Sequence, residues 1–308
     1  MKRIVIIAAM VLGCFCCGAQ TKAQGNVQAK AQNGVQNEKL SVLWMELTGP
    51  DFAKAVEKAE GVCIIPMGVL EKHGPHLPLA TDCILADYLA KMAAEMEYAI
   101  VFPTFYVGQI NEAKHQPGTV AYTTELCLKM LEETCAEVAR NGCKKIILFS
   151  QHGGNNALVN LFCQSQLNSE RDYIVYETLF GEKPEVRAKI AKMIKTYSGE
   201  HAGEQESSEL MAARPDLIKL DQAATQNGEA LNRLPLERLR PSIFWYADYP
   251  NHFAGEPSQS NIELGKYSNL ESAKFLAEKI KKVKQDKVGP ALQAEFFEKA
   301  KHPLDTEQ

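Results

Sequence analysis

The stretch VCIIPMGVLEKHGPHLPLATD, residues 62–82, joins an apolar run to a loop that is rich in reactive side chains. The run VCIIPM is apolar throughout, which is typical of a strand that is buried on both faces. Glycine and proline restrict the backbone of the loop behind it, which carries four groups that bind protons or metals: Glu71, His73, His76 and Asp82. A loop that only connects two elements needs no such set, so we expect this one to have a chemical role.

The rest of the folded chain alternates between similar apolar runs and helical patterns. The apolar runs are YAIVFPTFYVG, KKIILFSQ and DYIVYETLF, and the helical patterns cover residues 83–96, 124–141, 156–169, 204–214 and 269–283. Doubly apolar strands between amphipathic helices predict an α/β protein with a parallel sheet that is covered on both faces. We expect one domain over residues 39–285, with a loop-rich insertion at 227–256 and a helical tail at 286–308.

The first residues predict an exported protein. Two basic residues precede the short apolar run IVIIAAMVLGCFCCGA, which is the order found in secretory signals. Two processing routes remain open, because VLGC resembles a bacterial lipobox that would leave Cys14 as a lipid anchor, whereas cleavage after Ala19 would release a soluble periplasmic protein. We therefore expect a signal at 1–19, followed by a flexible linker of low apolar content at 20–38.

Composition excludes several classes of function. The 308 residues carry a formal net charge of −4 and contain no basic run with interleaved aromatic residues, so we expect no nucleic-acid partner. The cysteines beyond the signal form no CxxC pair, which argues against a zinc-finger or thioredoxin-type site. They occur singly in apolar segments, where cysteine usually serves as a small buried side chain.

Polar motifs follow the predicted strands. HQPGT follows the second apolar run, SQHGGN follows the third, and HAGEQESS precedes a helix. Because ligands bind beyond the carboxyl ends of parallel strands, we expect these motifs to lie near Glu71 and His73. His115, in the first motif, could hydrogen-bond a substrate or simply brace its loop.

The residue types in these motifs favour metal-dependent hydrolysis. Carboxylates with imidazoles suit zinc, manganese or iron, and the lack of thiolates argues against a closed structural zinc site. Glu71 and His73 could reach neighbouring metals from an extended segment, and Asp82 has a second oxygen with which to bridge them. Two ions about 3.5–4 Å apart can hold a hydroxide and polarise a carbonyl.

The segment QHGGNN has a weaker signal. Gly153 and Gly154 would permit a tight turn and the close approach of a ligand to the backbone. Asn155 or Asn156 could cap the helix that follows, and free N–H groups at its start would favour an oxyanion. A plain turn between a strand and a helix would use the same residues, so this motif decides nothing alone.

With these motifs in this order, the chain resembles the creatininase (creatinine amidohydrolase) family over most of its folded region. GVLEKHGPHLPLATD is similar to that family's first metal loop, the three later motifs occur at family-like positions, and AGEPSQSNIELGK is similar to a further segment. The resemblance implies a three-layer α/β/α fold with a mostly parallel central sheet. It also implies a centre of two divalent ions (zinc, manganese or iron) and a homo-oligomer, commonly a hexamer.

The resemblance also implies roles for single residues. Those that match metal ligands are Glu71, His73, Asp82 (as the bridge) and His152. His201 matches a catalytic histidine. Creatininase proper has a ligand glutamate where this chain has Gly154, and because relatives with HGGN also carry HAGE, Glu204 is the expected replacement. Glu206 is the rival ligand, or a residue that orients the others in catalysis.

The tryptophans bear on the substrate. Creatinine-specific members of the family pack their substrate against tryptophans before the catalytic histidine, whereas this chain has only Trp44 and Trp245, with Tyr197 in the corresponding region. We therefore expect a substrate other than creatinine. The residues expected to contact it are His115, Gly153, Gly154, Asn155 and Tyr197.

The sequence thus predicts a metal-dependent hydrolase that acts on a small-molecule substrate. A metal-bridging hydroxide would attack the carbonyl carbon of a small cyclic or linear amide and so cleave its C–N bond, with His201 as the general acid that protonates the departing nitrogen. Two alternatives remain. The same centre could serve a hydrolase or lyase of a keto-sugar or diketone, or the protein could be a non-catalytic binding protein that contains metal.

Overall fold

The computed structural model describes residues 40–178, 183–196, 199, 201–236 and 239–307. The predicted signal at 1–19, with Cys14, and the predicted linker at 20–38 lie outside these ranges, as does Tyr197.

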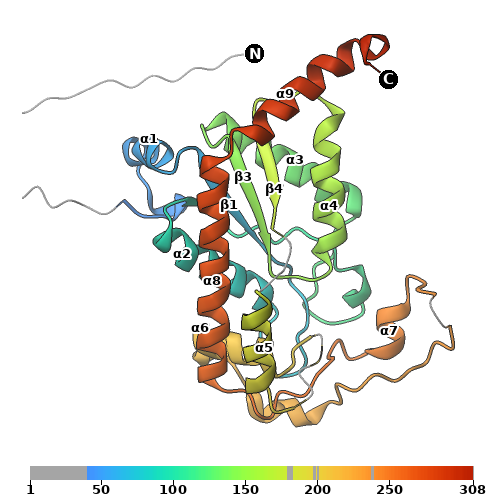
Figure 1. Ribbon diagram of the computed structural model, residues 1–308. Coiled ribbons are helices and arrows are strands. Elements are labelled where there is room, and N and C mark those ends of the chain that lie inside the picture. The colour runs from blue at the N-terminus through green and yellow to red at the C-terminus, as the bar shows by residue number, and fades with distance from the viewer. Residues whose placement is uncertain (1–39, 179–182, 197–198, 200, 237–238, 308) are drawn as a thin grey trace, which may run out of the picture. The chain divides into compact units, whose positions relative to one another are not determined.

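A four-stranded parallel sheet in the order β2-β1-β3-β4 forms the centre of the described chain (Figure 1). The strands are β1 (Val62–Met67), β2 (Ile100–Val101), β3 (Lys145–Ser150) and β4 (Ile174–Glu177). β1 pairs in parallel with β3 along its whole length, and all six of its residues are buried. The second predicted strand forms only two residues of ladder before the chain leaves at Phe102, and it rejoins β1 in a single bridge between Met67 and Phe105.

Helices cover both faces of this sheet. The α-helices of the described residues are α1 (Gly49–Lys58), α2 (Thr81–Met96), α3 (Thr124–Arg140), α4 (Asn155–Ser165), α5 (Pro184–Met193), α6 (Glu204–Ala213), α7 (Phe244–Asp248), α8 (Ile262–Gln285) and α9 (Val288–Lys301). Figure 1 shows α2 and α8 on one side of the sheet and α3 and α4 on the other. The predicted three-layer α/β/α arrangement with a parallel sheet is confirmed.

Successive side chains of a strand point to opposite faces, which explains why the sheet has a hydrophobic core on each face. In β1, Val62 and Ile64 pack with side chains of α2 and α8, whereas Cys63 and Ile65 pack with those of α3 and α4. Successive strand residues point to opposite faces, so a strand between two helical layers must be apolar at every position. Each such buried aliphatic side chain contributes roughly 1.5–3 kcal/mol to folding.

Side-chain caps mark the starts of several helices. The hydroxyl of Thr123 accepts a hydrogen bond from the Leu126 amide at the start of α3, and Asn261 accepts one from the Leu264 amide at the start of α8. Both satisfy a backbone donor that has no partner inside the helix. α1 and α5 were not among the predicted helices, and α7 lies within the insertion that was predicted to be loop-rich.

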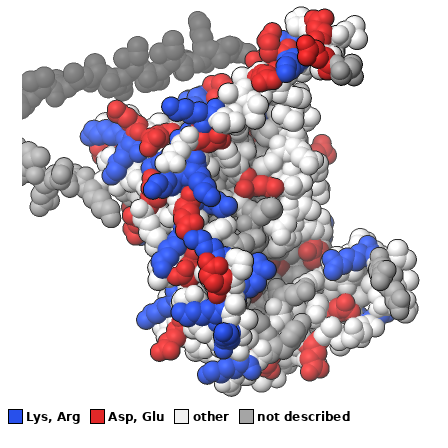
Figure 2. Space-filling model, viewed as in Figure 1, with Lys and Arg blue, Asp and Glu red and all other residues white. Residues whose placement is uncertain are grey.

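The surface helices carry mixed charge. Figure 2 shows lysine, arginine, aspartate and glutamate side by side over α8 and its neighbours on the face in view. Several form ion pairs, such as Lys274 with Glu271 and Lys183 with Glu278. None of the described helices could serve as a membrane span, and α8, the longest of them, carries charged side chains along its length.

Candidate metal centre

The loop after β1 folds back on itself and buries its reactive side chains. The Glu71 amide donates to the Leu79 carbonyl at 3.0 Å, and the Leu77 amide donates to the His73 carbonyl at 3.3 Å. Gly74 makes the turn with a φ of +58°, a conformation that glycine adopts most easily. Glu71 and His73 are buried as a result, and both face the interior.

The first turn of α2 delivers Asp82 to the same place. A methyl group at Gly68, just after β1, would lie 2.5 Å from the Cys83 amide nitrogen and 2.8 Å from the Asp82 Cβ. Only glycine therefore allows the end of the strand and the start of the helix to approach so closely. Asp82 is buried here.

His152 reaches the loop from the end of β3. Its Nε2–H donates to the Gln109 carbonyl at 2.7 Å, which leaves Nδ1 to face Glu71 Oε1 at 2.7 Å and Asp82 Oδ2 at 3.2 Å. A backbone carbonyl that fixes the second ring nitrogen in this way is typical of a histidine that binds a metal.

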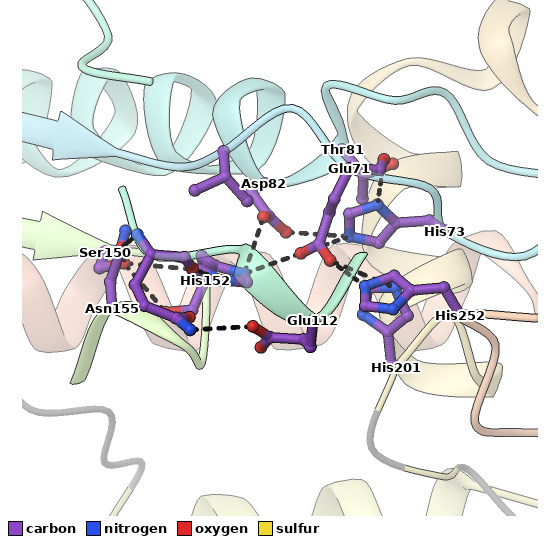
Figure 3. Close-up of polar contacts among 12 residues, drawn as sticks. Glu71, His73, Thr81, Asp82, Glu112, Ser150, His152, Asn155, His201 and His252 are labelled. Carbon is purple, nitrogen blue, oxygen red and sulfur yellow. Dashed lines mark hydrogen bonds and ion pairs between the residues drawn. The ribbon is translucent and has the colours of Figure 1, made fainter. Parts of the chain in front are cut away.

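His73 occupies the other side of Asp82. Its Nδ1–H donates to the Glu71 carbonyl at 3.2 Å, and its Nε2 lies 2.9 Å from Asp82 Oδ1 and 3.5 Å from Glu206 Oε1. Figure 3 shows Asp82 between His73 and His152, with Glu71 alongside. Two groups of potential ligands therefore share Asp82: Glu71, Asp82 and His152, and His73, Asp82 and Glu206.

The electrostatics of the cluster favour a cation. Burial alone would raise the pKa of Glu71, but His152 and His201 lower it well below its usual range. Burial likewise opposes ionisation of Glu206, yet His73 lowers its pKa to about 2. Both carboxylates are therefore ionised at neutral pH. Buried carboxylates persist in this form only beside positive charge.

Unpartnered oxygens test whether metals fit. Glu71 Oε1 and Asp82 Oδ2 are buried and accept no hydrogen bond from the described residues. Both lie against His152 Nδ1, so two carboxylate oxygens and one ring nitrogen converge on a space that a cation would fill. The negative charge of Glu71 and Asp82 also acts on His152. Burial lowers the pKa of this histidine, but the two carboxylates outweigh burial and raise the pKa well above its usual range. The nitrogen and oxygen donors, without thiolate, suit zinc, manganese or iron.

His201 lies beside the cluster. Its ring is 4.2 Å from the His73 ring, and its Nε2–H donates to the Lys72 carbonyl at 2.8 Å. Burial, with a contribution from His73, lowers the pKa of His201, so the imidazole is neutral at pH 7 in the metal-free protein. The Nε2 atom lies 3.9 Å from Glu71 Oε2. Sequence reasoning predicted a catalytic histidine at this position, and the structure brings it to the site.

Glu204, the expected replacement ligand, does not reach the cluster. Its two carboxylate oxygens accept hydrogen bonds from the amides of Lys195 and Thr196, at 2.7–3.1 Å, and from the Thr196 hydroxyl. Glu204 instead braces the segment before His201. Glu206, the rival ligand, lies beside His73 instead, with Oε1 3.5 Å from His73 Nε2.

The glycines of QHGGNN have different surroundings. A methyl group at Gly154 would lie 2.4 Å from His152 Nε2 and 2.9 Å from the Gln109 carbonyl oxygen, whereas one at Gly153 would meet no atom within 4 Å. Gln109 thus fills the space beside Gly154. No larger residue, and hence no ligand glutamate, fits at this position.

Asn155, which was predicted to contact the substrate, lies in the interior of the protein. It is fully buried, its Oδ1 accepts from the Gln109 amide at 3.0 Å, and its Nδ2 donates to Ser150 Oγ at 3.2 Å. It therefore ties two loops together, where no substrate could reach it, and it lies inside α4 and does not cap it. The amides of Asn155 and Asn156 donate to the carbonyls of His152 and Gly153, so neither is free for an oxyanion.

His115 lies on the rim of a cavity of about 680 Å³. The cavity is lined by Gln109, Asn111, Glu112, Lys114, His115, Ser242, Ile243, Phe244 and Tyr246. The exposed His115 ring bonds to the Pro250 carbonyl at 2.8 Å and meets the edge of Tyr246. Both roles considered for His115, bracing a loop and facing a ligand, are compatible with this position.

Sequence reasoning missed His252. It is buried, and its Nε2 forms a short hydrogen bond to Glu71 Oε2, across 181 residues of sequence. It lies in the insertion and follows no strand, so it lacked the signal that identified the other histidines. The only hint was its place just before AGEPSQSNIELGK.

The comparisons with known proteins agree with this geometry. A family model described as creatinine amidohydrolase matches residues 45–280, which is most of the chain. The chain belongs to the creatininase family. It is 27% identical over 195 residues to creatinine amidohydrolase of Pseudomonas putida, which covers 59% of this chain and 75% of that protein. It is also 25% identical over 247 residues to mycofactocin precursor peptide peptidase of Mycolicibacterium smegmatis. This match covers 78% of this chain and 93% of that protein.

Solved structures share the fold of this creatininase-family chain. A manganese form of creatininase superposes with a TM-score of 0.65 at 22% identity, over 79% of this chain and 98% of that one. A zinc form of a creatininase variant superposes with a TM-score of 0.66 at 22% identity, again over 79% of this chain and 98% of that one. The relatives are named as an amidohydrolase and a peptidase, both of which cleave C–N bonds, so this chain is an amidohydrolase of the creatininase family.

Proposed function

We propose that this amidohydrolase binds two divalent cations and uses them to hydrolyse a C–N bond in a small amide. The shared carboxylate of Asp82 carries the proposal, since Oδ1 lies 2.9 Å from His73 Nε2 and Oδ2 lies 3.2 Å from His152 Nδ1. One cation would be held by Glu71, Asp82 and His152, and the other by His73, Asp82 and Glu206. Zinc, manganese and iron all suit these donors.

When bound, the cations would lower the pKa of a water molecule, so that hydroxide is available near neutral pH, and would polarise the substrate carbonyl. The protein's own part is to keep the ligands rigid and the carboxylates of Glu71 and Glu206 ionised. Each histidine is fixed by a backbone carbonyl, that of Gln109 for His152 and that of Glu71 for His73. Because both rings are oriented before any ligand binds, little reorganisation is needed during the reaction.

His201 is the proposed proton donor. Its ring lies between His73 and His252, with centroids 4.2 and 4.7 Å away, so it stands at the edge of the metal ligands. The lowered pKa makes the imidazole neutral at pH 7. A neutral imidazole can first accept a proton from the nucleophile and then donate it to the departing nitrogen, which is general acid–base catalysis.

The cavity beside the centre favours a linear amide over a compact ring. Gln109, whose carbonyl binds His152, also lines this cavity of about 680 Å³. Phe244 and Tyr246 give it an aromatic wall, and Glu112 and Lys114 add charges of both signs. An amide with an extended side group would fill such a space, as a peptide does and creatinine does not. The relationship to a peptide peptidase supports this choice.

Two alternative functions predict different results in the same assay. If the protein were a keto-sugar or diketone hydrolase or lyase, metal-loaded enzyme would turn over those compounds and leave amides intact. If it only bound ligands, none would be turned over. The close approach of His201 to the cluster speaks for catalysis, because binding alone needs no proton donor there.

Turnover by the metal-loaded enzyme on parallel panels of peptides, cyclic amides and keto-sugars tests the proposal. We expect hydrolysis of one or more linear amides, and loss of at least a hundredfold in kcat with unchanged metal content in His201→Ala. Turnover confined to keto-sugars, or turnover that does not depend on added metal, would refute the amide hydrolase.

We propose that the protein is exported from the cytoplasm. The basic and apolar start of the chain supports export, with either a lipid anchor at Cys14 or a soluble periplasmic form. Mass spectrometry of the mature N-terminus distinguishes the two. We also propose a homo-oligomer, as the family resemblance implies, and light scattering of the purified protein tests it.

A further inference from the structure

His252 makes a hydrogen bond with each ring nitrogen. The indole N–H of Trp245 donates to His252 Nδ1 at 3.2 Å. Since an indole nitrogen can only donate, Nδ1 must be the acceptor, and the ring proton must be on Nε2. That Nε2–H donates to Oε2 of Glu71. Trp245 thus determines which tautomer of His252 faces the carboxylate.

This contact makes the two oxygens of Glu71 different, because only Oε1 remains without a hydrogen bond from the described residues. Oε2 is occupied by His252, whereas Oε1 accepts no hydrogen bond from the described residues and lies 2.7 Å from His152 Nδ1. Rotation of the carboxylate would break the hydrogen bond between Oε2 and His252, so this bond holds Oε1 toward His152. The Trp245–His252 pair therefore sets the orientation of Glu71.

The backbone of His252 is also fixed in an uncommon conformation. Its φ is +51°, a region that residues other than glycine rarely adopt. The His252 amide donates to the Tyr249 carbonyl at 2.9 Å, and its carbonyl accepts from the Gly74 amide at 3.2 Å. The latter bond ties His252 to the loop that carries Glu71. Conformations of this kind persist where the surrounding contacts enforce them, often at functional sites.

The same segment connects to the loop of the catalytic histidine. Ala254 and His201 exchange two backbone hydrogen bonds, at 3.0 and 3.1 Å, and the rings of His201 and His252 lie 4.7 Å apart. A short stretch of the insertion thus reaches both the first metal loop and His201. Neither contact follows from the motifs of the sequence.

We propose that Trp245 and His252 are positioning residues that orient Glu71 for the cation it shares with Asp82 and His152. This inference rests on the proposed binuclear centre. Outer-shell partners of metal ligands typically contribute 10- to 100-fold to metal affinity. The pair should therefore affect one cation and not the other.

Metal titration of chelator-treated protein tests this. Zn²⁺ is added in competition with a chromophoric chelator, and wild type should bind two ions in two resolvable steps. Glu71→Gln and Glu206→Gln identify which step belongs to which group of ligands. The test variants are Trp245→Phe, which keeps the ring and loses the donor, and His252→Asn, because asparagine tolerates positive φ. The matched controls are Trp44→Phe and His302→Asn.

We expect both test variants to weaken the Glu71-dependent step by 10- to 100-fold, and the other step by less than about threefold. The controls should match wild type. Metal affinities within twofold of wild type in both test variants would overturn the inference. Equal weakening of both binding steps, together with a lower melting temperature of the metal-free protein, would also overturn it, because a purely structural role gives that result. Fewer than two ions in wild type would overturn the proposed function as well.

Discussion

Glu204 and Glu206 are two residues apart and have different roles. Successive helix residues are rotated by about 100°, so side chains two positions apart on α6 point in nearly opposite directions. Glu204 accepts from the backbone of Lys195 and Thr196, and Glu206 faces His73. Glu206 also accepts a hydrogen bond from the Ala202 amide at 2.5 Å, which fixes it beside the loop that carries His201.

Substituting each glutamate separates these roles. Glu206→Gln should lose one of two bound metal equivalents, because an amide is a poor ligand for the cation beside His73. Glu204→Gln should keep both metals and lower the free energy of unfolding by roughly 1–3 kcal/mol, since it removes the charged acceptor that the Lys195 and Thr196 amides share. Elemental analysis and denaturant unfolding measure the two effects. Loss of metal in Glu204→Gln alone would restore the original assignment.

His76 should make stability depend on pH. It is buried, its Nε2 bonds to Ser207 Oγ at 3.0 Å, and burial lowers its pKa to about 4, although Glu206 opposes this. The unfolded chain, with an ordinary pKa near 6.5, binds the proton first as pH falls. The stabilisation is therefore complete above pH 6.5 and is lost towards pH 4, by up to about 3 kcal/mol.

The variant His76→Gln lacks this titration. Denaturant unfolding of metal-free protein between pH 7 and 4 should show a smaller loss of stability in the variant than in wild type. His302→Gln, on an exposed histidine, is the control and should follow wild type. Parallel curves for wild type and His76→Gln would contradict the prediction.

At the scale of elements, the turn between β3 and α4 determines where His152 points. Gly154→Ala would place a methyl group 2.4 Å from His152 Nε2, and Gly153→Ala would place one in open space. We expect Gly154→Ala to cost about 1–3 kcal/mol, as overpacking usually does, and to lower metal content by displacing His152. Gly153→Ala should change stability by less than about 0.5 kcal/mol. Equal stability and metal content in the two variants would refute this account.

Most elements could be predicted from sequence because their signals are local. β1 is apolar at all six positions and β3 is apolar from Ile146 to Phe149, which required a sheet covered on both faces. The two-residue β2 could not be predicted, because the length of a ladder depends on its neighbour. α1 and α5 have short amphipathic patterns next to proline, which hide them among loops.

At the scale of the molecule, the candidate centre draws on segments from Glu71 to His252, 181 residues apart. Glu71 and His73 could be predicted because their spacing and their strand are local features. The choice between Glu204 and Glu206 could not, because it depends on which direction α6 faces. His252 reaches Glu71 only through the packing of the insertion, which has no periodic pattern to read.

Metal binding should stabilise the whole domain through Asp82. A ligand that binds only the folded state stabilises it by about 4 kcal/mol at a concentration of 1,000 times its dissociation constant, which corresponds to roughly 10 °C in melting temperature for a domain of this size. Wild type should show this rise with Zn²⁺ or Mn²⁺ at neutral pH, and it should contain about two metals per chain.

Asp82→Ala should abolish both the rise and the second metal, because Asp82 is the one carboxylate that both groups of ligands share. Asp216→Ala is the matched control, since Asp216 forms an exposed ion pair with Arg214 outside the centre. Differential scanning calorimetry with and without metal, alongside elemental analysis, makes the measurement. A full rise in Asp82→Ala would show that the cations bind without a shared carboxylate, and the binuclear arrangement would then be wrong even if the enzyme hydrolysed amides.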